Sequence, residues 1–249
     1  VCWMLYLPLD KSHFITGLQF RLDLRSKSLL VTCYLVPLVF YAIMGGIFTS
    51  VMPEVSDTLI QSMTVMGVSM GALIGVPPTL AEIYGTDVRR MYQAGGVPLS
   101  FGLAAAALSA FIHLMIMSGI ICVTAPLAFG ASLPQDMPRY VASLALFLIV
   151  SLSIACALGV WVRDQAKLTM FSQLIFLPSI MLSGILFPSD LLPEFLQTLG
   201  RIFPAAWGYR LMAQGAGGLE TAGSLTALTV ILILACILCA LGLRRRRSD

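Results

Sequence analysis

Apolar residues dominate six stretches of this chain, and each stretch is about as long as a bilayer's hydrocarbon core is thick. The stretches lie at about 28–50, 58–80, 99–129, 140–162, 168–187 and 224–243. Runs of about 20 apolar residues with few charges are typical of membrane-spanning helices, because a helix satisfies its own backbone hydrogen bonds where no water is present. The pattern therefore predicts an all-α polytopic membrane protein with six transmembrane helices, formed by residues 1–249 as a single transmembrane domain.

Prolines modify two of these expected spans. Pro77 and Pro78 stand near the far end of the second span, where they predict a kink or the end of the helix. The third span is longer than a bilayer requires. We expect it either to continue as helix beyond the bilayer or to break at Pro126.

The segment that follows the fifth span, residues 188–208, has an amphipathic helical pattern that is too short and too polar to cross a membrane. Its leucine and phenylalanine residues recur every three or four positions, with charged and amide side chains between them. We expect the fifth helix to break at Pro188 and to be followed by one or two short helices in the interface or partly back in the membrane, a re-entrant excursion. An ordinary extracytoplasmic loop with a surface helix is the alternative.

Residues 11–27 also have an amphipathic pattern. Phe14, Ile15, Leu18 and Leu22 cluster on one side at helical spacing, among several basic residues. This pattern favours an interfacial helix that lies along the membrane before the first span, and a disordered basic arm is the alternative.

The composition agrees with a membrane protein. Of the 249 residues, 58% are hydrophobic and 11% are charged, and the mean hydropathy is +0.92. Soluble domains carry about 25% charged residues, so this chain could not present a solvated surface on all sides. A nucleic-acid partner is not expected, because the basic residues stand beside apolar spans rather than on an aromatic-studded face.

The distribution of basic residues predicts the orientation. With the N-terminus in the cytoplasm, only Arg139, Arg201 and Arg210 of the 15 lysines and arginines fall on the outer side. Both termini are then cytoplasmic, and 81–98 is the largest cytoplasmic loop between spans. Membrane lipids are the expected surroundings.

Few side chains in the spans could support chemistry. His113 in the third span is an exception, and we expect it to form a hydrogen bond with a neighbouring helix rather than to couple ion flow. Cys236 and Cys239 have a C-x-x-C spacing without a second ligand pair, so they are expected to pack rather than to bind a metal. The chain has no phosphate-binding loop and no H-E-x-x-H motif. It is therefore not expected to be an enzyme, and the energy for any transport must come from elsewhere.

The loop 81–98 combines charges of alternating sign with glycines near both ends. Thr86 could cap a short helix that covers 87–93. Such a helix is well shaped to dock into a groove on a cytosolic partner, and a solvated connector is equally compatible with the pattern.

Taken together, these features resemble the membrane permease subunits of type-2 ABC exporters, which include drug-resistance, antibiotic-export and polysaccharide-export permeases. An amphipathic segment precedes the first span at 11–27, and an E-x-x-G-T stretch follows the second span at 82–86, with Pro98 before the next span. The fifth span ends in an S-G-x-x-x-P pattern at 183–188, followed by a proline-bounded excursion that closes at Pro204. The sequence departs from the usual pattern at 95–98, where Gly-Gly-Val-Pro replaces a single residue before proline.

The resemblance implies a half-transporter that works as a dimer, with a second copy of this permease or a homologous one, and with two copies of an ABC ATPase subunit. ATP and Mg²⁺ would be bound by the ATPase, and no cofactor by this chain. The location implied is the bacterial cytoplasmic (inner) membrane. The loop 81–98 would be the coupling helix on the ATPase, and 188–208 would be re-entrant helices at the exit of a central path.

Three groups of residues follow as candidates from this resemblance. The coupling residues are Glu82, Gly85, Thr86, Asp87, Arg89 and Arg90. The extracytoplasmic gate residues are Ser183, Gly184, Pro188, Pro193, Phe203 and Pro204. The path would be lined from spans one, two and five by Phe40, Met63, Met66, Met70, Phe171 and Phe176, although each of these could instead face lipid or pack against helices.

Methionine and aromatic surfaces adapt to varied lipophilic ligands, so the expected substrate is a hydrophobic drug, antibiotic, lipid or peptide. Three alternatives remain: the permease of a polysaccharide or glycolipid exporter, an ion-coupled secondary carrier, and a non-transporting immunity or scaffold protein.

Overall fold

The computed structural model describes residues 30–51, 57–83, 99–162, 164–186, 192–213 and 219–248. Within these ranges every regular element is helical and there is no strand, which confirms the all-α prediction. The elements are η2 (Val31–Leu35), α3 (Val36–Val51), α4 (Leu59–Met70), η4 (Gly71–Gly75), α5 (Val76–Ile83), α7 (Leu99–Phe129), α8 (Met137–Trp161), α9 (Gln165–Met181), α10 (Glu194–Gly200), α11 (Pro204–Ala213) and α12 (Leu219–Ser248).

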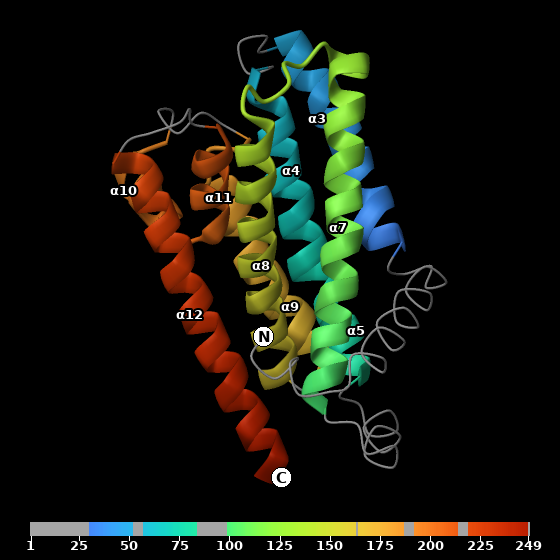
Figure 1. Ribbon diagram of the computed structural model, residues 1–249, viewed down its shortest axis with the longest axis vertical. Coiled ribbons are helices and arrows are strands. Elements are labelled where there is room, and N and C mark those ends of the chain that lie inside the picture. Colours follow the sequence, from blue (N-terminus) through green and yellow to red (C-terminus); the bar gives the residue numbers. More distant parts are fainter. Residues whose placement is uncertain are drawn as a thin grey trace.

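The long helices run side by side as a bundle, with α12 inclined along one side of it (Figure 1). The first residues of α4, α8 and α12 are at one end of the bundle, and the short helices α10 and α11 lie at the same end. The end of α5 and the end of α12 lie toward the opposite end. The expected interfacial helix 11–27 lies outside the described residues.

Five helices in the described part of the chain are long and apolar enough to cross a membrane. They are Val31–Val51, Leu59–Ala81, Phe101–Phe129, Met137–Trp161 and Thr221–Arg245. These five correspond to the first four expected spans and the sixth. The third expected span, 99–129, has the same bounds as α7 and continues as helix through Pro126.

The fifth expected span differs from the structure. It was expected to cover 168–187, but α9 begins at Gln165 and ends at Met181, which is 17 residues. Leu182 donates its backbone N–H to the carbonyl of Pro178, and Gly184 has a φ of 82°. A left-handed glycine ends a helix because it turns the backbone away from the helix axis without steric cost. The helix therefore ends before Pro188, which lies outside the described residues.

The second span forms the centre of the bundle. Every residue from Leu59 to Ser69 is buried, and α4 packs against α3, α7, α8, α9 and α11. Small residues allow this close packing: a Cβ added at Gly67 would lie 2.8 Å from the Met117 methyl group, and one added at Gly71 would overlap the side chain of Leu114. By contrast, α12 is mostly exposed, as a helix at the edge of a membrane bundle would be.

Two π-helical segments occur in the described residues, and each ends two residues before a proline. The segment η2 precedes Pro37, and η4 precedes Pro77 and Pro78. A proline clashes with the carbonyl four residues earlier, and a wider turn at that place relieves the clash. The second span therefore does not end at its prolines but continues as α5 to Ile83. The two π segments pack against each other.

Aspartate caps begin two of the helices. The Asp136 carboxylate accepts the backbone N–H of Arg139 at 3.2 Å, at the start of α8. The Asp164 carboxylate accepts that of Lys167 at 2.9 Å, at the start of α9. These bonds satisfy amide donors that have no partner within the helix and so fix where each helix begins.

Candidate functional site

The turn after α9 forms the first part of the candidate gate. Ser183 is buried, and its hydroxyl donates to the Ile180 carbonyl at 2.8 Å. The left-handed Gly184 follows it. The end of α10 packs on this turn, because a Cβ at Gly200 would overlap the Leu182 carbonyl. Residues 182–184 and the α10–α11 junction are thus held together.

The junction between α10 and α11 is closed by hydrogen bonds to the backbone. Phe203 donates its N–H to the Gly200 carbonyl at 3.1 Å, and the Trp207 indole Nε1 donates to the Arg201 carbonyl at 2.6 Å. Pro204 is the buried first residue of α11, and Phe203 is half-buried. The exposed Pro193 caps the start of α10.

The helix α11 packs into the bundle rather than standing apart from it. Its buried residues include Ala205, Ala206 and Leu211, and it contacts α4, α8, α9 and α12. A Cβ at Gly208 would overlap the ring of Phe147 on α8. The candidate gate is therefore continuous with the helical core at this end of the bundle.

The candidate path residues divide into two groups. Met63, Met66 and Phe176 are buried in the core, and Met70 packs partly buried against it. Phe40 and Phe171 are exposed on the outside of the bundle, at about 40% each. The structure of one chain therefore does not bring the six side chains into one cavity.

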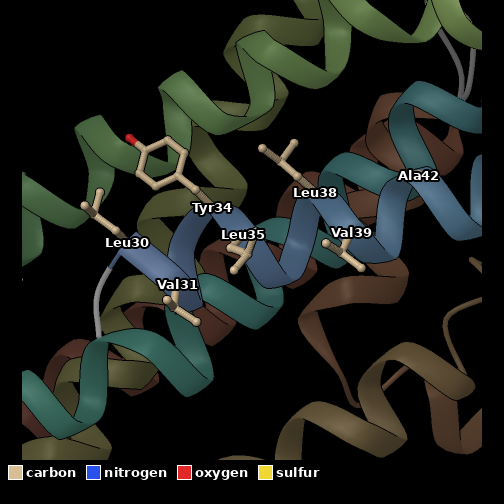
Figure 2. Close-up of a pocket in the computed structure, with 7 residues that line it drawn as sticks. All are labelled: Leu30, Val31, Tyr34, Leu35, Leu38, Val39 and Ala42. Carbon is tan, nitrogen blue, oxygen red and sulfur yellow. The ribbon is translucent and has the colours of Figure 1, made fainter. Parts of the chain in front are cut away.

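An apolar groove of about 550 Å³ lies along the first span, and it is lined by Leu30, Val31, Tyr34, Leu35, Leu38, Val39 and Ala42. Figure 2 shows Tyr34 directed toward the neighbouring helix. Its hydroxyl lies 2.8 Å from Nδ1 of His113 on α7, and His113 is fully buried. This confirms the expected hydrogen bond between His113 and a neighbouring helix.

A set of uncharged polar side chains inside the bundle was not singled out from the sequence. Thr64 of α4 and Tyr140 of α8 form a buried hydrogen bond of 2.8 Å. Four further buried oxygens have no hydrogen-bond partner among the described residues: Gln61 Oε1, Ser62 Oγ, Ser172 Oγ and Ser179 Oγ. The polar residues of α4, which interrupt an otherwise apolar span, are the feature of the sequence that could have indicated this polar set. Among the described residues, the interior can thus offer hydrogen bonds, and no Asp, Glu, Lys or Arg is buried there.

The candidate coupling residues are mostly outside the described part of the chain. Glu82 lies in the last turn of α5. Gly85, Thr86, Asp87, Arg89 and Arg90 follow it beyond the described residues. The helix α5 itself packs against α7, α8, α9 and η4, so the segment that leads into the loop is firmly seated in the bundle.

The apolar helices indicate a multi-pass membrane protein, and no Asp, Glu, Lys or Arg is buried in the described part of the bundle. Residues 13–216 match the family model described as ABC-2 type transporter. This match covers most of the chain, so the chain belongs to the ABC-2 type transporter family, as the sequence motifs predicted.

A curated relative gives a more distant comparison. The chain is 25% identical over 142 residues to the linearmycin resistance permease protein LnrN of Bacillus subtilis (strain 168). The matched region is 57% of this chain and 37% of the relative, so it spans little more than a third of that protein's length.

Proposed function

We propose that this chain is the membrane permease subunit of an ATP-driven exporter that carries a lipophilic substrate out of the cell. The observation that carries the proposal is the family match over residues 13–216. The absence of charge supports it: the five long helices carry no Asp, Glu, Lys or Arg except near their ends. Ion-coupled carriers bind ions through such groups at mid-membrane, so a separate ATPase is the better energy source. The name of the LnrN relative supports an antibiotic as one substrate class.

The loop 81–98 is the proposed contact with the ATPase. Its proposed residues are Glu82, Gly85, Thr86, Asp87, Arg89 and Arg90. The helix α5 runs directly into this loop and is packed against three other helices. A displacement of the loop by the ATPase would therefore reach the interior of the bundle. ATP and Mg²⁺ would be bound in the ATPase, which is present in two copies.

The proposed assembly pairs this chain with a second copy or a homologous permease. Exposed apolar side chains form a ridge along α9, with Met170, Phe171, Leu174 and Leu177. The first span carries another ridge, which includes Val39 and Phe40. A path between two permeases would have such ridges along its wall, and it would explain why one chain does not bring the six candidate path residues into one cavity.

The proposed location is the bacterial cytoplasmic membrane, with both termini in the cytoplasm. The described basic residues support this orientation. Lys167 is in the first turn of α9, which follows the end of α8, and Arg244 and Arg245 are near the end of α12. Arg139 is in the first turn of α8, and Arg201 and Arg210 belong to the α10–α11 segment. The end of α12 lies at one end of the bundle, and the start of α8 lies with α10 and α11 at the other (Figure 1). In the proposed topology, 12 of the 15 lysines and arginines of the whole sequence would be on the cytoplasmic side.

The test is purification of the chain from its native host in mild detergent, with mass spectrometry of every co-purifying chain. We expect a soluble chain with a phosphate-binding loop, and we expect Arg89→Glu with Arg90→Glu to release it and to lower substrate-stimulated ATP hydrolysis. Lys167→Glu is the matched control, because it reverses an exposed charge on the same side outside the loop. A chain that purifies alone in several gentle detergents and in nanodiscs would refute the proposal.

A further inference from the structure

We propose that the α10–α11 segment is a membrane-interface anchor that binds the phosphate headgroup of an anionic phospholipid. The interface patch consists of Phe195, Arg201, Ile202, Trp207 and Arg210, all on α10, α11 or the turn between them. The inference concerns lipid binding and does not depend on the ATPase or on the exported substrate.

Two large apolar side chains of the interface patch are largely exposed in the described part of the chain. Phe195 is 72% exposed and Ile202 is 67% exposed, which is more than for most apolar side chains of the long helices. In water such side chains would be unfavourable, and in a short helix at the edge of a membrane they insert into the acyl region just below the headgroups.

Trp207 places the interface patch at headgroup level. Of the two tryptophans in the described residues, Trp161 is the last residue of α8 and Trp207 is in α11. The end of α8 and the helix α11 lie toward opposite ends of the bundle (Figure 1). Tryptophan is enriched at both membrane–water interfaces because its ring is apolar and its N–H is polar. The Trp207 N–H is satisfied by the Arg201 carbonyl at 2.6 Å, so its ring is held in a fixed place.

The cations of the interface patch suit a phosphate. The Arg210 guanidinium carbon lies 5.4 Å from the centre of the Trp207 ring, in a cation–π arrangement. A guanidinium stacked on a ring keeps its N–H donors free at its edge, in the geometry that binds phosphate oxygens in pairs. Arg201 is exposed and lies six residues before Trp207 in the chain.

Charge complementarity identifies the occupant. Arg201 and Arg210 are two of the three basic residues that the proposed topology puts on the outer side. Arg201 directly precedes the exposed Ile202 in the chain, and Arg210 stacks on the ring of Trp207. Glu194, at the start of α10, is the acidic residue on the same short helix and lies two turns before Arg201. An anionic lipid supplies both an acyl chain for Phe195 and Ile202 and a phosphate for the arginines. The assignment to the outer leaflet rests on the proposed topology, whereas lipid binding itself does not.

The experiment uses the full chain in nanodiscs with Trp207 as the only tryptophan, through Trp3→Phe and Trp161→Phe. Fluorescence quenching is compared between brominated phosphatidylglycerol and brominated phosphatidylcholine at equal mole fraction. We expect both lipids to quench Trp207, with stronger quenching by the anionic lipid. The preference should fall at high salt, because an exposed charge pair is screened.

The double substitution Arg201→Gln with Arg210→Gln should remove the preference for the anionic lipid while both lipids still quench Trp207. A variant with Arg201→Gln and Arg210→Lys should recover part of that preference. Arg139→Gln is the matched control, because Arg139 is the third outer arginine and donates to the Thr221 hydroxyl at 3.1 Å outside the interface patch. Equal quenching by both lipids in the parent, no quenching by either, or a preference that survives the double substitution in a folded protein would overturn the proposal.

Discussion

The hydrogen bond between Thr64 and Tyr140 joins the central helix α4 to α8, and its removal gives the sharpest test of the packing. The two hydroxyl oxygens lie 2.8 Å apart. Thr64 is fully buried and Tyr140 is 3% exposed, so no water reaches either group from outside the bundle. Thr64→Val keeps the shape of the side chain and leaves the Tyr140 hydroxyl without this partner.

The expected magnitude follows from the setting. Hydrogen bonds between transmembrane helices contribute on average ~0.6 and at most ~1.7 kcal/mol, and an orphaned buried hydroxyl costs about 1–3 kcal/mol. We therefore expect Thr64→Val to lower the free energy of unfolding by about 1–2 kcal/mol. Tyr140→Phe should cost less, because the Thr64 hydroxyl can then turn to the carbonyl one helical turn earlier.

The assay is reversible unfolding in detergent for both single variants and the double variant. The double-mutant cycle should give a coupling energy of about 0.6–1.7 kcal/mol. Thr229→Val is the control, since Thr229 is exposed on α12 and bonds only its own helix, at the Leu225 carbonyl. The bond does not hold α4 to α8 if Thr64→Val lowers the free energy of unfolding no more than Thr229→Val does. The same conclusion follows if the effects of Thr64→Val and Tyr140→Phe are additive in the double variant.

Two further predictions concern helix contacts. Gly208→Ala should lower the free energy of unfolding by about 1–3 kcal/mol, because the new methyl group would overlap the Phe147 ring. Gly223→Ala is the control: nothing lies within 4 Å of the added methyl group, so the stability should stay unchanged or rise. Trp161→Phe should cost about 0.5–1.5 kcal/mol in the same unfolding assay, since the indole N–H donates to the Leu238 carbonyl at 2.8 Å and links α8 to α12. Equal melting temperatures for the two glycine variants, or a Trp161 variant as stable as the parent, would contradict these expectations.

The sequence by itself determined the class of protein and most of the helices. Hydropathy is a local property, and a long charge-free run in a membrane has no alternative to helix. For this reason the third expected span coincides with α7, and the other long spans agree with the structure to within a few residues. The motifs at 82–86 and 183–188 likewise pointed to the family that the comparison shows.

The sequence did not determine the end of the fifth helix. Pro188 was the strongest local signal for a break, yet α9 ends at Met181, where the chain turns through Gly184. The turn is held by contacts with α10, whose Gly200 lies against the Leu182 carbonyl. Such a contact joins segments that are separated in sequence, so no local pattern reports it.

Only the tertiary structure decided which face of each helix is buried. The α4 and α12 spans are both apolar, but α4 is enclosed by neighbours and α12 is largely exposed. In a membrane, lipid and protein interior are equally apolar, so hydrophobicity does not distinguish them, and packing and interhelical hydrogen bonds decide instead. For this reason only the structure identifies Tyr34 as the hydrogen-bond partner of His113 and Tyr140 as that of Thr64.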